Sequence, residues 1–188
     1  FGFGVKTGID LPNEASASNL LYSLSNLHSA EMATSSFGQG FNCTPIQAIT
    51  AFSSIINGGK LMRPYVVSQV VDNDGNIVRE NSPQVVRSVV SKETSDFVRT
   101  AMEDVFTEGT GKKAAIQGYA FGGKTGTAQQ GDRSKQKYTL SFIAYHSIED
   151  PNIICLTLIH KPANYSDVGG AATPVPMMKT LLEKIITY

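Results

Sequence analysis

Three β-rich runs in the last third of the chain constrain its fold more than any other feature. They span residues 119–129, 138–146 and 153–160, and short polar turns separate them. Runs rich in β-branched and aromatic residues that are joined by tight turns predict consecutive antiparallel strands. The pair Thr173-Pro174 then begins a segment whose apolar residues recur at helical spacing. The sequence therefore predicts a three-stranded meander with an amphipathic helix packed on it.

The first half of the chain predicts mainly helices. Thr44 is suited to cap a helix that has Pro45 at its first position, and two glycines at 58 and 59 end the apolar stripe that follows. An Asp-Gly turn within "YVVSQVVDNDGNIVRE" predicts a hairpin. Two further helices are expected over residues 18–28 and from Ser91 to about 107. Helices followed by a helix-covered meander indicate an α+β fold.

Length and charge limit the classes of function. The 188 residues are enough for one domain with a sizeable core. Sixteen basic residues balance sixteen acidic ones, so we expect no nucleic-acid partner. The local cluster Arg133, Lys135 and Lys137 is interpreted as the solvated tip of a hairpin. The sequence contains no apolar run long enough to span a membrane.

The sequence offers no convincing metal or cofactor site. Cys43 and Cys155 are far apart in apolar surroundings, which favours two free buried thiols but leaves a disulfide open. Their spacing to the three histidines does not resemble a set of metal ligands. "DNDGN" opens like a calcium loop, but position twelve counted from Asp72 is Pro83, where such a loop has Glu. We therefore expect a hairpin turn there, no metal and no cofactor.

The segment "GGKTGTAQQG", residues 122–131, carries the chemistry that the sequence predicts. Lys124 offers a point charge to a carboxylate or to a neighbouring hydroxyl, and the hydroxyls of Thr125 and Thr127 can hold a carboxylate. Gly126 has no side chain, so an extended ligand could lie along this backbone as an added strand. The N–H group of Thr127 could serve as one donor of an oxyanion hole. A Lys-Thr-Gly triplet alone is weak evidence and favours an ordinary surface strand.

Several longer segments resemble one family in the same order along the chain. They are "FGFGVKTGIDLPNE", "SSFGQGFNCTPIQAITAFSSIINGGKLMRPYVV", "EGTGKKAAIQGYAFGGKTGTAQ" and "GGAATPVP". Together they resemble the C-terminal part of the transpeptidase domain of class B penicillin-binding proteins, and the resemblance covers nearly all 188 residues. It implies a penicillin-binding-protein and β-lactamase-like fold in which the segment at 122–129 is the active-site strand. The earlier triplet Lys6-Thr7-Gly8 matches a different, Gly-rich segment of the family.

The resemblance implies a serine acyl-enzyme, but this chain lacks the nucleophile. The family uses a Ser in an S-x-x-K motif and an S-x-N triplet, both upstream of the segment that resembles "FGFG". The only S-x-x-K here joins Ser134 to Lys137 in the predicted turn, on the wrong side of the motif order, and no S-x-N exists. Residues 1–188 are thus expected to be the C-terminal portion of one transpeptidase domain. The missing N-terminal part of that domain is an expected partner, and the chain alone is expected to be inactive.

The implied function of the complete protein is peptidoglycan D,D-transpeptidation. Its implied partners are stem peptides ending in D-Ala-D-Ala and β-lactam antibiotics, which would acylate the same Ser. Lys124 and Thr127 are the implied catalytic residues, and Thr125, Gly126, Thr127 and Gln129 the implied substrate-binding residues. The implied location is the outer face of the bacterial cytoplasmic membrane, through an N-terminal anchor absent from this chain. A β-lactamase or D,D-carboxypeptidase on the same fold, or a non-catalytic penicillin sensor or scaffold, remain alternatives.

Overall fold

The computed structural model describes residues 1–15, 21–131, 137–162 and 174–187. Its backbone contacts divide the chain into two compact units. Unit 1 comprises Phe1–Met32 and Gly40–Ser95, and unit 2 comprises Ala33–Gln39 and Asp96–Tyr188. Helices and antiparallel strands occur together, so the predicted α+β fold is confirmed. The assignment of residues 1–188 to a portion of one domain stays a prediction.

The central helix of unit 1, α2 (Pro45–Ile56), begins where the sequence predicts. Its first turn forms a capping box: the Gln47 backbone N–H donates to the hydroxyl of Thr44 at 3.2 Å, and the Thr44 N–H donates to the Gln47 side chain at 3.0 Å. The amide of Gln47 is buried and also donates to the carbonyl oxygen of Val5 at 2.6 Å. This one side chain therefore closes the helix and fixes the N-terminal segment to it.

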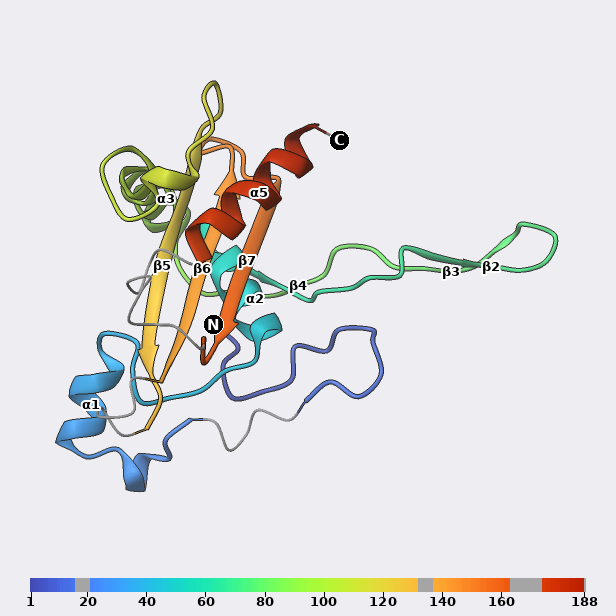
Figure 1. Ribbon diagram of the computed structural model, residues 1–188. Coiled ribbons are helices and arrows are strands. Elements are labelled where there is room, and N and C mark those ends of the chain that lie inside the picture. Colours follow the sequence, from blue (N-terminus) through green and yellow to red (C-terminus); the bar gives the residue numbers. More distant parts are fainter. Residues whose placement is uncertain (16–20, 132–136, 163–173, 188) are drawn as a thin grey trace. The chain divides into compact units, whose positions relative to one another are not determined.

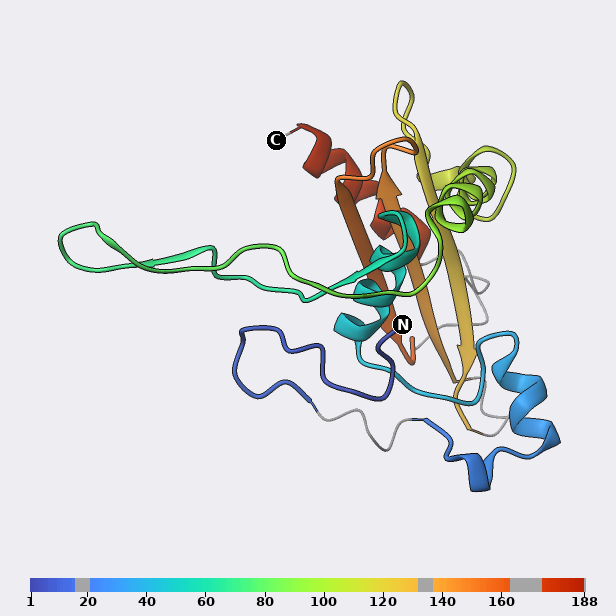
Figure 2. The ribbon, with the colours of Figure 1, turned by 180° about the vertical axis from the view of Figure 1, so that it is seen from behind.

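A two-stranded antiparallel ribbon follows α2. Its strands β1 (Lys60–Met62) and β4 (Val85–Ser88) pair at the base, and β2 (Gln69–Val71) and β3 (Ile77–Glu80) pair further out. Figures 1 and 2 show the ribbon extending away from α2. The carboxylate of Asp72 accepts the backbone N–H groups of Asp74 and Asn76, so "DNDGN" is the hairpin turn that was predicted. The sequence did not predict the pairing of β1 with β4.

The N-terminal segment differs from the prediction. Within the described part of residues 18–28, the chain forms only the short 3₁₀ helix η1 (Leu24–Asn26), and Leu24 is 94% exposed. The α-helix of this region, α1 (Ser29–Ser35), begins after the predicted one would have ended. The helix predicted over residues 18–28 is therefore wrong for its described part, residues 21–28, where Leu24 points into solvent and Leu27 is only partly buried. A short helix is marginal unless one face is well buried.

Unit 2 contains the predicted meander. Strands β5 (Phe121–Gln129), β6 (Tyr138–His146) and β7 (Ile153–His160) form an antiparallel sheet in the order β5-β6-β7. All three lie within two residues of the predicted bounds, which confirms them. Figure 1 shows that β5 is an edge strand of this sheet.

Helices pack on this sheet. The predicted helices are confirmed as α3 (Lys92–Thr107) and α5 (Pro174–Thr187), and a 3₁₀ turn, η2 (Lys112–Ala114), lies between α3 and β5. The ring of Phe106 on α3 stacks between Phe121 and Phe142 at centroid distances of 5.5 and 5.4 Å. Met178 and Leu182 of α5 are fully buried in the same cluster. Burying several such side chains contributes about 1.5–3 kcal/mol each, so this cluster fixes the sheet that carries the Lys-Thr-Gly segment.

Two further observations concern expectations from the sequence. Both cysteines are free; Cys155 is buried, as predicted, whereas Cys43 is only partly buried. Burial raises the pKa of both thiols. Among the described helices, none combines the length and the apolar character that crossing a bilayer requires.

Gly59 is predicted to be indispensable for the fold of unit 1. Its φ is +91°, and a Cβ built on it would lie 2.0 Å from the carbonyl oxygen of Val90. The neighbouring Gly58 has a φ of +84° but no atom within 4 Å of such a Cβ. We expect Gly59→Ala to lower the free energy of unfolding by more than about 2 kcal/mol, and Gly58→Ala by about 1 kcal/mol for left-handed strain alone.

Denaturant unfolding of the complete protein measures both variants in parallel. Equal losses for Gly58→Ala and Gly59→Ala would show that the close approach to Val90 is not what requires glycine at this position.

Candidate active-site strand

The glycines before Lys124 are required by packing within the sheet. Gly122 and Gly123 are both buried. A Cβ on Gly122 would lie 2.2 Å from the hydroxyl oxygen of Tyr145, and a Cβ on Gly123 would lie 2.3 Å from the carbonyl oxygen of Ile143. The aromatic ring and the backbone of β6 thus occupy the space that side chains would need. The two glycines allow β5 to lie close to β6 and thereby fix the position of Lys124.

Hydrogen bonds at both ends of β5 set its register. The Ser147 N–H donates to the carbonyl of Ala120 at 3.1 Å, and the Gln130 N–H donates to the carbonyl of Lys137 at 2.7 Å. The pairing of β5 with β6 between these points runs without a register shift. In a regular antiparallel ladder, alternate residues exchange both of their backbone bonds with the partner strand. The even-numbered residues of β5 therefore bond to β6.

The backbone N–H and C=O groups of the odd-numbered residues consequently point to the free edge of β5. The N–H and C=O groups of Thr125, Thr127 and Gln129 point away from β6, and no described strand pairs with β5 there. Two side chains use this edge: the Lys124 ammonium donates to the Thr125 carbonyl at 2.8 Å, and the Gln39 amide donates to the Thr127 carbonyl at 3.1 Å. Within the described part of the chain, the N–H donors at alternate residues of this edge are therefore unpaired, as an added strand would need.

The side chains of the Lys-Thr-Gly segment lie on both faces of the sheet. Successive side chains of a strand alternate, so Lys124 lies on one face, opposite Ile143, and the side chains of Thr125 and Thr127 lie on the other. Lys124 and Thr127 are exposed. The contact of the ammonium with the Thr125 carbonyl shows that Lys124 reaches around to the edge. The edge is where the charge and the two hydroxyls can act on one ligand.

Gly126 and Gln129 complete the predicted set. A Cβ on Gly126 would lie 2.6 Å from the hydroxyl oxygen of Ser141, a flexible neighbour on β6. Gln129 is the last residue of β5 and is partly buried, with its backbone on the free edge. The structure thus brings all five predicted residues of the segment onto one strand. Their roles in catalysis or binding stay predictions.

Two residues at this strand were missed by the sequence analysis. The hydroxyl of Thr110 lies 2.8 Å from that of Thr125, and Gln39 bonds to Thr127 from a segment 88 residues away in the sequence. Both belong to segments that resemble the family, "SSFGQGF" and "EGTGKKA", so a signal for them existed. Neither has a spacing to Lys124 that indicates contact.

Other candidates from the sequence do not join this strand. His160 bonds to the hydroxyl of Thr139 at 2.8 Å, and His146 packs edge-on against Phe121 at a centroid distance of 5.5 Å. Both histidines therefore have structural contacts. The predicted hairpin tip with Arg133 and Lys135, and Ser134 of the misplaced S-x-x-K, lie outside the described residues.

Comparisons with known proteins identify the family to which the chain belongs. Residues 1–183 match the family model described as the penicillin-binding protein transpeptidase domain. The chain is 39% identical over 180 residues to stage V sporulation protein D of Bacillus subtilis, covering 93% of this chain and 28% of that protein. It is 31% identical to a peptidoglycan D,D-transpeptidase FtsI homolog of Mesostigma viride, covering 97% and 33%. The chain thus spans about a third of the length of these relatives.

Solved structures show the same fold. The apo form of penicillin-binding protein 3 from Mycobacterium tuberculosis is similar with a TM-score of 0.84 and 27% identity, over 99% of this chain and 44% of that one. The same protein complexed with ampicillin also gives a TM-score of 0.84, over 99% and 43%. The α+β arrangement described above is therefore that of a penicillin-binding-protein transpeptidase domain.

Tyr145, on which Gly122 packs, gives a prediction for alkaline pH. Its hydroxyl donates to the carbonyl of Arg99 at 2.8 Å, and burial is the main cause that raises its pKa from 10.0 to about 12. A raised pKa means that the folded state favours the neutral phenol. The resulting stability is present below pH 10.0 and is lost as the pH rises through about 12. We expect Tyr145→Phe to lose about 1 kcal/mol near neutral pH, because a hydrogen bond is removed, and to show a flatter decline above pH 10.0.

Urea unfolding of the complete protein across this alkaline range provides the measurement. Tyr119→Phe, at an exposed ring, is the matched control and should keep the wild-type decline. A Tyr145→Phe variant that declines as steeply as the wild type contradicts a buried, neutral phenol.

Proposed function

Because this chain belongs to the penicillin-binding-protein transpeptidase domain family, we propose that the complete protein is a peptidoglycan D,D-transpeptidase that works through a serine acyl-enzyme. One observation carries the proposal: the free edge of β5 presents the Thr127 N–H next to the Lys124 ammonium and the hydroxyl of Thr125. This group of a donor, a cation and hydroxyls suits a peptide that ends in a carboxylate.

Each residue of the segment has a role in the proposal. Lys124 supplies positive potential to the substrate carboxylate, and the hydroxyls of Thr125 and Thr127 hydrogen-bond that carboxylate. The Thr127 N–H contributes one donor to the oxyanion hole, a contribution of about 2.7–4 kcal/mol where such donors have been removed. Gly126 leaves room for the peptide, which lies along the edge as far as Gln129. The outward direction of the odd-numbered backbone groups supports these roles.

The proposed reaction is an acyl transfer in two steps. A serine hydroxyl outside these 188 residues attacks the carbonyl carbon of the penultimate D-Ala of a stem peptide. The bond to the last D-Ala breaks, and this residue leaves as a free amine with the proton from the serine. An amine of a neighbouring stem peptide then attacks the ester, forms the cross-link and returns the serine to its free state. A β-lactam that resembles the D-Ala-D-Ala end acylates the same serine.

The catalytic serine, its lysine and the S-x-N triplet belong to the proposed remainder of the protein. We expect the 188-residue chain by itself not to react with penicillin, since acyl transfer requires a nucleophile held next to a base. The proposed location is the outer face of the cytoplasmic membrane, where the peptidoglycan precursors are cross-linked.

Labelling of the complete protein with a fluorescent penicillin tests the proposed function. We expect a covalent adduct that stays attached for many minutes and that unlabelled ampicillin prevents. Rapid loss of the label would favour a hydrolase on this fold, and no label at all would favour a non-catalytic relative. Either result overturns the proposal.

Lys124→Ala in the complete protein tests the role of the strand. We expect the second-order rate of penicillin acylation to fall by about a hundredfold or more, the usual effect of removing an electrostatic contact to the developing charge. Thermal stability should change little, because Lys124 is exposed and has no carboxylate partner among the described residues.

Lys112→Ala, at another exposed lysine of unit 2, is the matched control and should leave both quantities unchanged. If Lys124→Ala acylates at the wild-type rate, Lys124 is not part of the site.

A further inference from the structure

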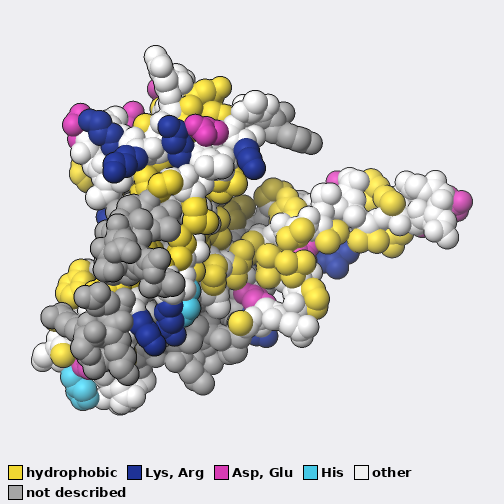
Figure 3. All heavy atoms as spheres, viewed as in Figure 1, with side chains coloured by type: hydrophobic (Ala, Val, Ile, Leu, Met, Phe, Trp, Pro, Cys, Tyr) yellow, Lys and Arg dark blue, Asp and Glu magenta, His cyan; other side chains and the backbone are white. Residues whose placement is uncertain are grey.

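The ribbon of residues 60–88 has an unusually apolar and open surface. Every residue of β2, β3 and β4 is exposed, and because successive side chains of a strand alternate, both faces of the ribbon are uncovered. Figure 3 shows hydrophobic side chains along its length. The exposed large apolar residues are Tyr65, Val66, Val67, Val70, Val71, Ile77, Val78, Val85 and Val86.

The contacts between the two strands of such a ribbon are not enough to stabilise it in water. An isolated two-stranded hairpin is marginal in water, and stable sheets need a third strand or a packed face. The valines and isoleucine have exposed fractions up to 67%, at Val78, so they gain little from burial in unit 1. Soluble proteins rarely expose a contiguous apolar patch of this kind unless it is an interaction surface.

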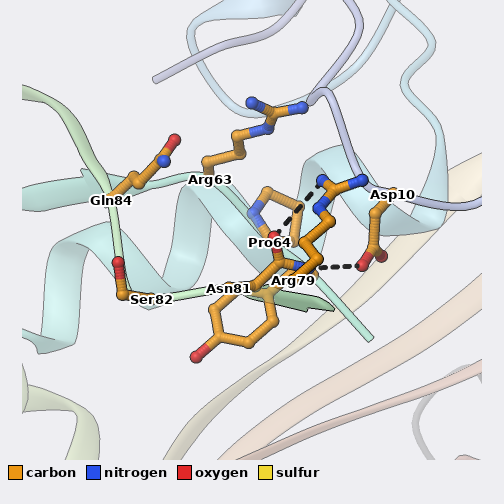
Figure 4. Close-up of a pocket in the computed structure, with 8 residues that line it drawn as sticks. Asp10, Arg63, Pro64, Arg79, Asn81, Ser82 and Gln84 are labelled. Atoms are coloured by element: carbon orange, nitrogen blue, oxygen red, sulfur yellow. Dashed lines mark hydrogen bonds between the residues drawn. The ribbon is translucent and has the colours of Figure 1, made fainter. Parts of the chain in front are cut away.

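A small cavity with two guanidinium groups lies beside the ribbon where its two ladders meet. Arg63 and Arg79 line this cavity of about 70 Å³, together with Asp10, Asn81 and Ser82. Figure 4 shows Arg63, which follows β1, and Arg79 of β3 among the residues that line the cavity. Arg63 donates through Nε to the carbonyl of Gly8 at 2.7 Å, and Arg79 donates to the side-chain oxygen of Asn81 at 3.3 Å. Neither arginine forms an ion pair with a carboxylate among the described residues.

The nearest carboxylate is already occupied by other donors. Asp10 accepts the N–H groups of Val66 and Val67 at 2.8 and 3.0 Å and the side-chain amide of Asn81 at 3.3 Å. These bonds, led by that from Val66, together with the nearby charge of Arg79, lower the pKa of Asp10 and hold it ionised as an anchor for the loop. The two arginines therefore offer at least two free N–H donors to a further anion. Guanidinium groups bind carboxylates through such N–H donors.

We propose that the ribbon is the docking surface for a segment of the same polypeptide that lies outside residues 1–188. This segment covers the valines with apolar side chains and places an Asp or Glu carboxylate between Arg63 and Arg79. The inference rests on the proposed function, which places the serine in the same absent part of the protein. The relatives provide the length: this chain spans 28% and 33% of two of them, and 44% of a solved chain that it matches along 99% of its own length.

A photo-cross-linker placed on the ribbon of the complete protein identifies the occupant. In a Cys43→Ser background, the cysteine introduced by Val78→Cys is labelled with a benzophenone maleimide. After irradiation, mass spectrometry maps the cross-linked peptides. Val86→Cys provides a second attachment point near the base, and Glu108→Cys, an exposed residue after α3, is the matched control. We expect cross-links from both ribbon positions to peptides of the same molecule outside residues 1–188. Cross-links to residues 96–187, between two copies, or none at all would overturn the proposal.

Charge reversal tests the carboxylate. Arg79→Glu removes one guanidinium and repels the expected acid, whereas Lys113→Glu reverses an exposed charge away from the ribbon. We expect maleimide modification of Val78→Cys to be at least about tenfold slower than that of Glu108→Cys, and Arg79→Glu to remove most of this protection while Lys113→Glu keeps it. Equal rates at both cysteines, or protection unaffected by Arg79→Glu, would overturn the proposed docking.

Fluorescent penicillin labelling of the same variants separates the two proposals. An adduct without protection of the ribbon refutes the docking surface alone, because Val78 is not among the residues proposed to bind penicillin. Protection without an adduct refutes the proposed function alone.

Discussion

The hydrogen-bond register between β5 and β6 is the constraint on which the rest of the account depends. It runs without a shift from the bond at Ala120 to the bond at Gln130. A slip by one residue would exchange the two sets of backbone groups and turn the Thr127 N–H from the free edge into the sheet. The aromatic cluster around Phe106 and the buried glycines before Lys124 hold this register in place. Packing in the core thus determines the direction in which the Thr127 N–H points.

Glycine is needed in this segment for two different physical reasons. Those at positions 122 and 123 are needed because Tyr145 and the backbone of β6 occupy the space beside them. Gly126 faces only the mobile hydroxyl of Ser141, so packing alone does not demand glycine there to the same degree. Accessibility to a ligand is therefore a reason for Gly126, whereas the earlier pair serves the contact between strands. The same short segment therefore specifies both the close contact of β5 with β6 and the open edge of β5.

The parts of the fold that follow from local patterns were predicted, and those that follow from distant contacts were not. The meander over residues 119–160 was recognised because strand residues and turns alternate clearly along it. The helix expected over residues 18–28 does not form in its described part, where Leu24 is exposed, because a short helix is marginal unless one face is well buried. The roles of Gln47 and Gln39 were not predicted, since a polar side chain that bonds to a distant backbone carbonyl leaves no periodic signal. Lys124 was found through its motif, but only the sheet register shows which backbone groups lie beside it.

Amide hydrogen exchange in β5 of the complete protein tests the central claim most directly. In the free enzyme, the N–H groups of Gly126 and Ala128 should exchange slowly because β6 accepts them, and those of Thr125 and Thr127 should exchange quickly from the open edge. Acylation by penicillin should then slow the exchange at Thr127. Protection of Thr127 in the free enzyme, or exchange at Thr127 that acylation leaves unchanged, would contradict the account.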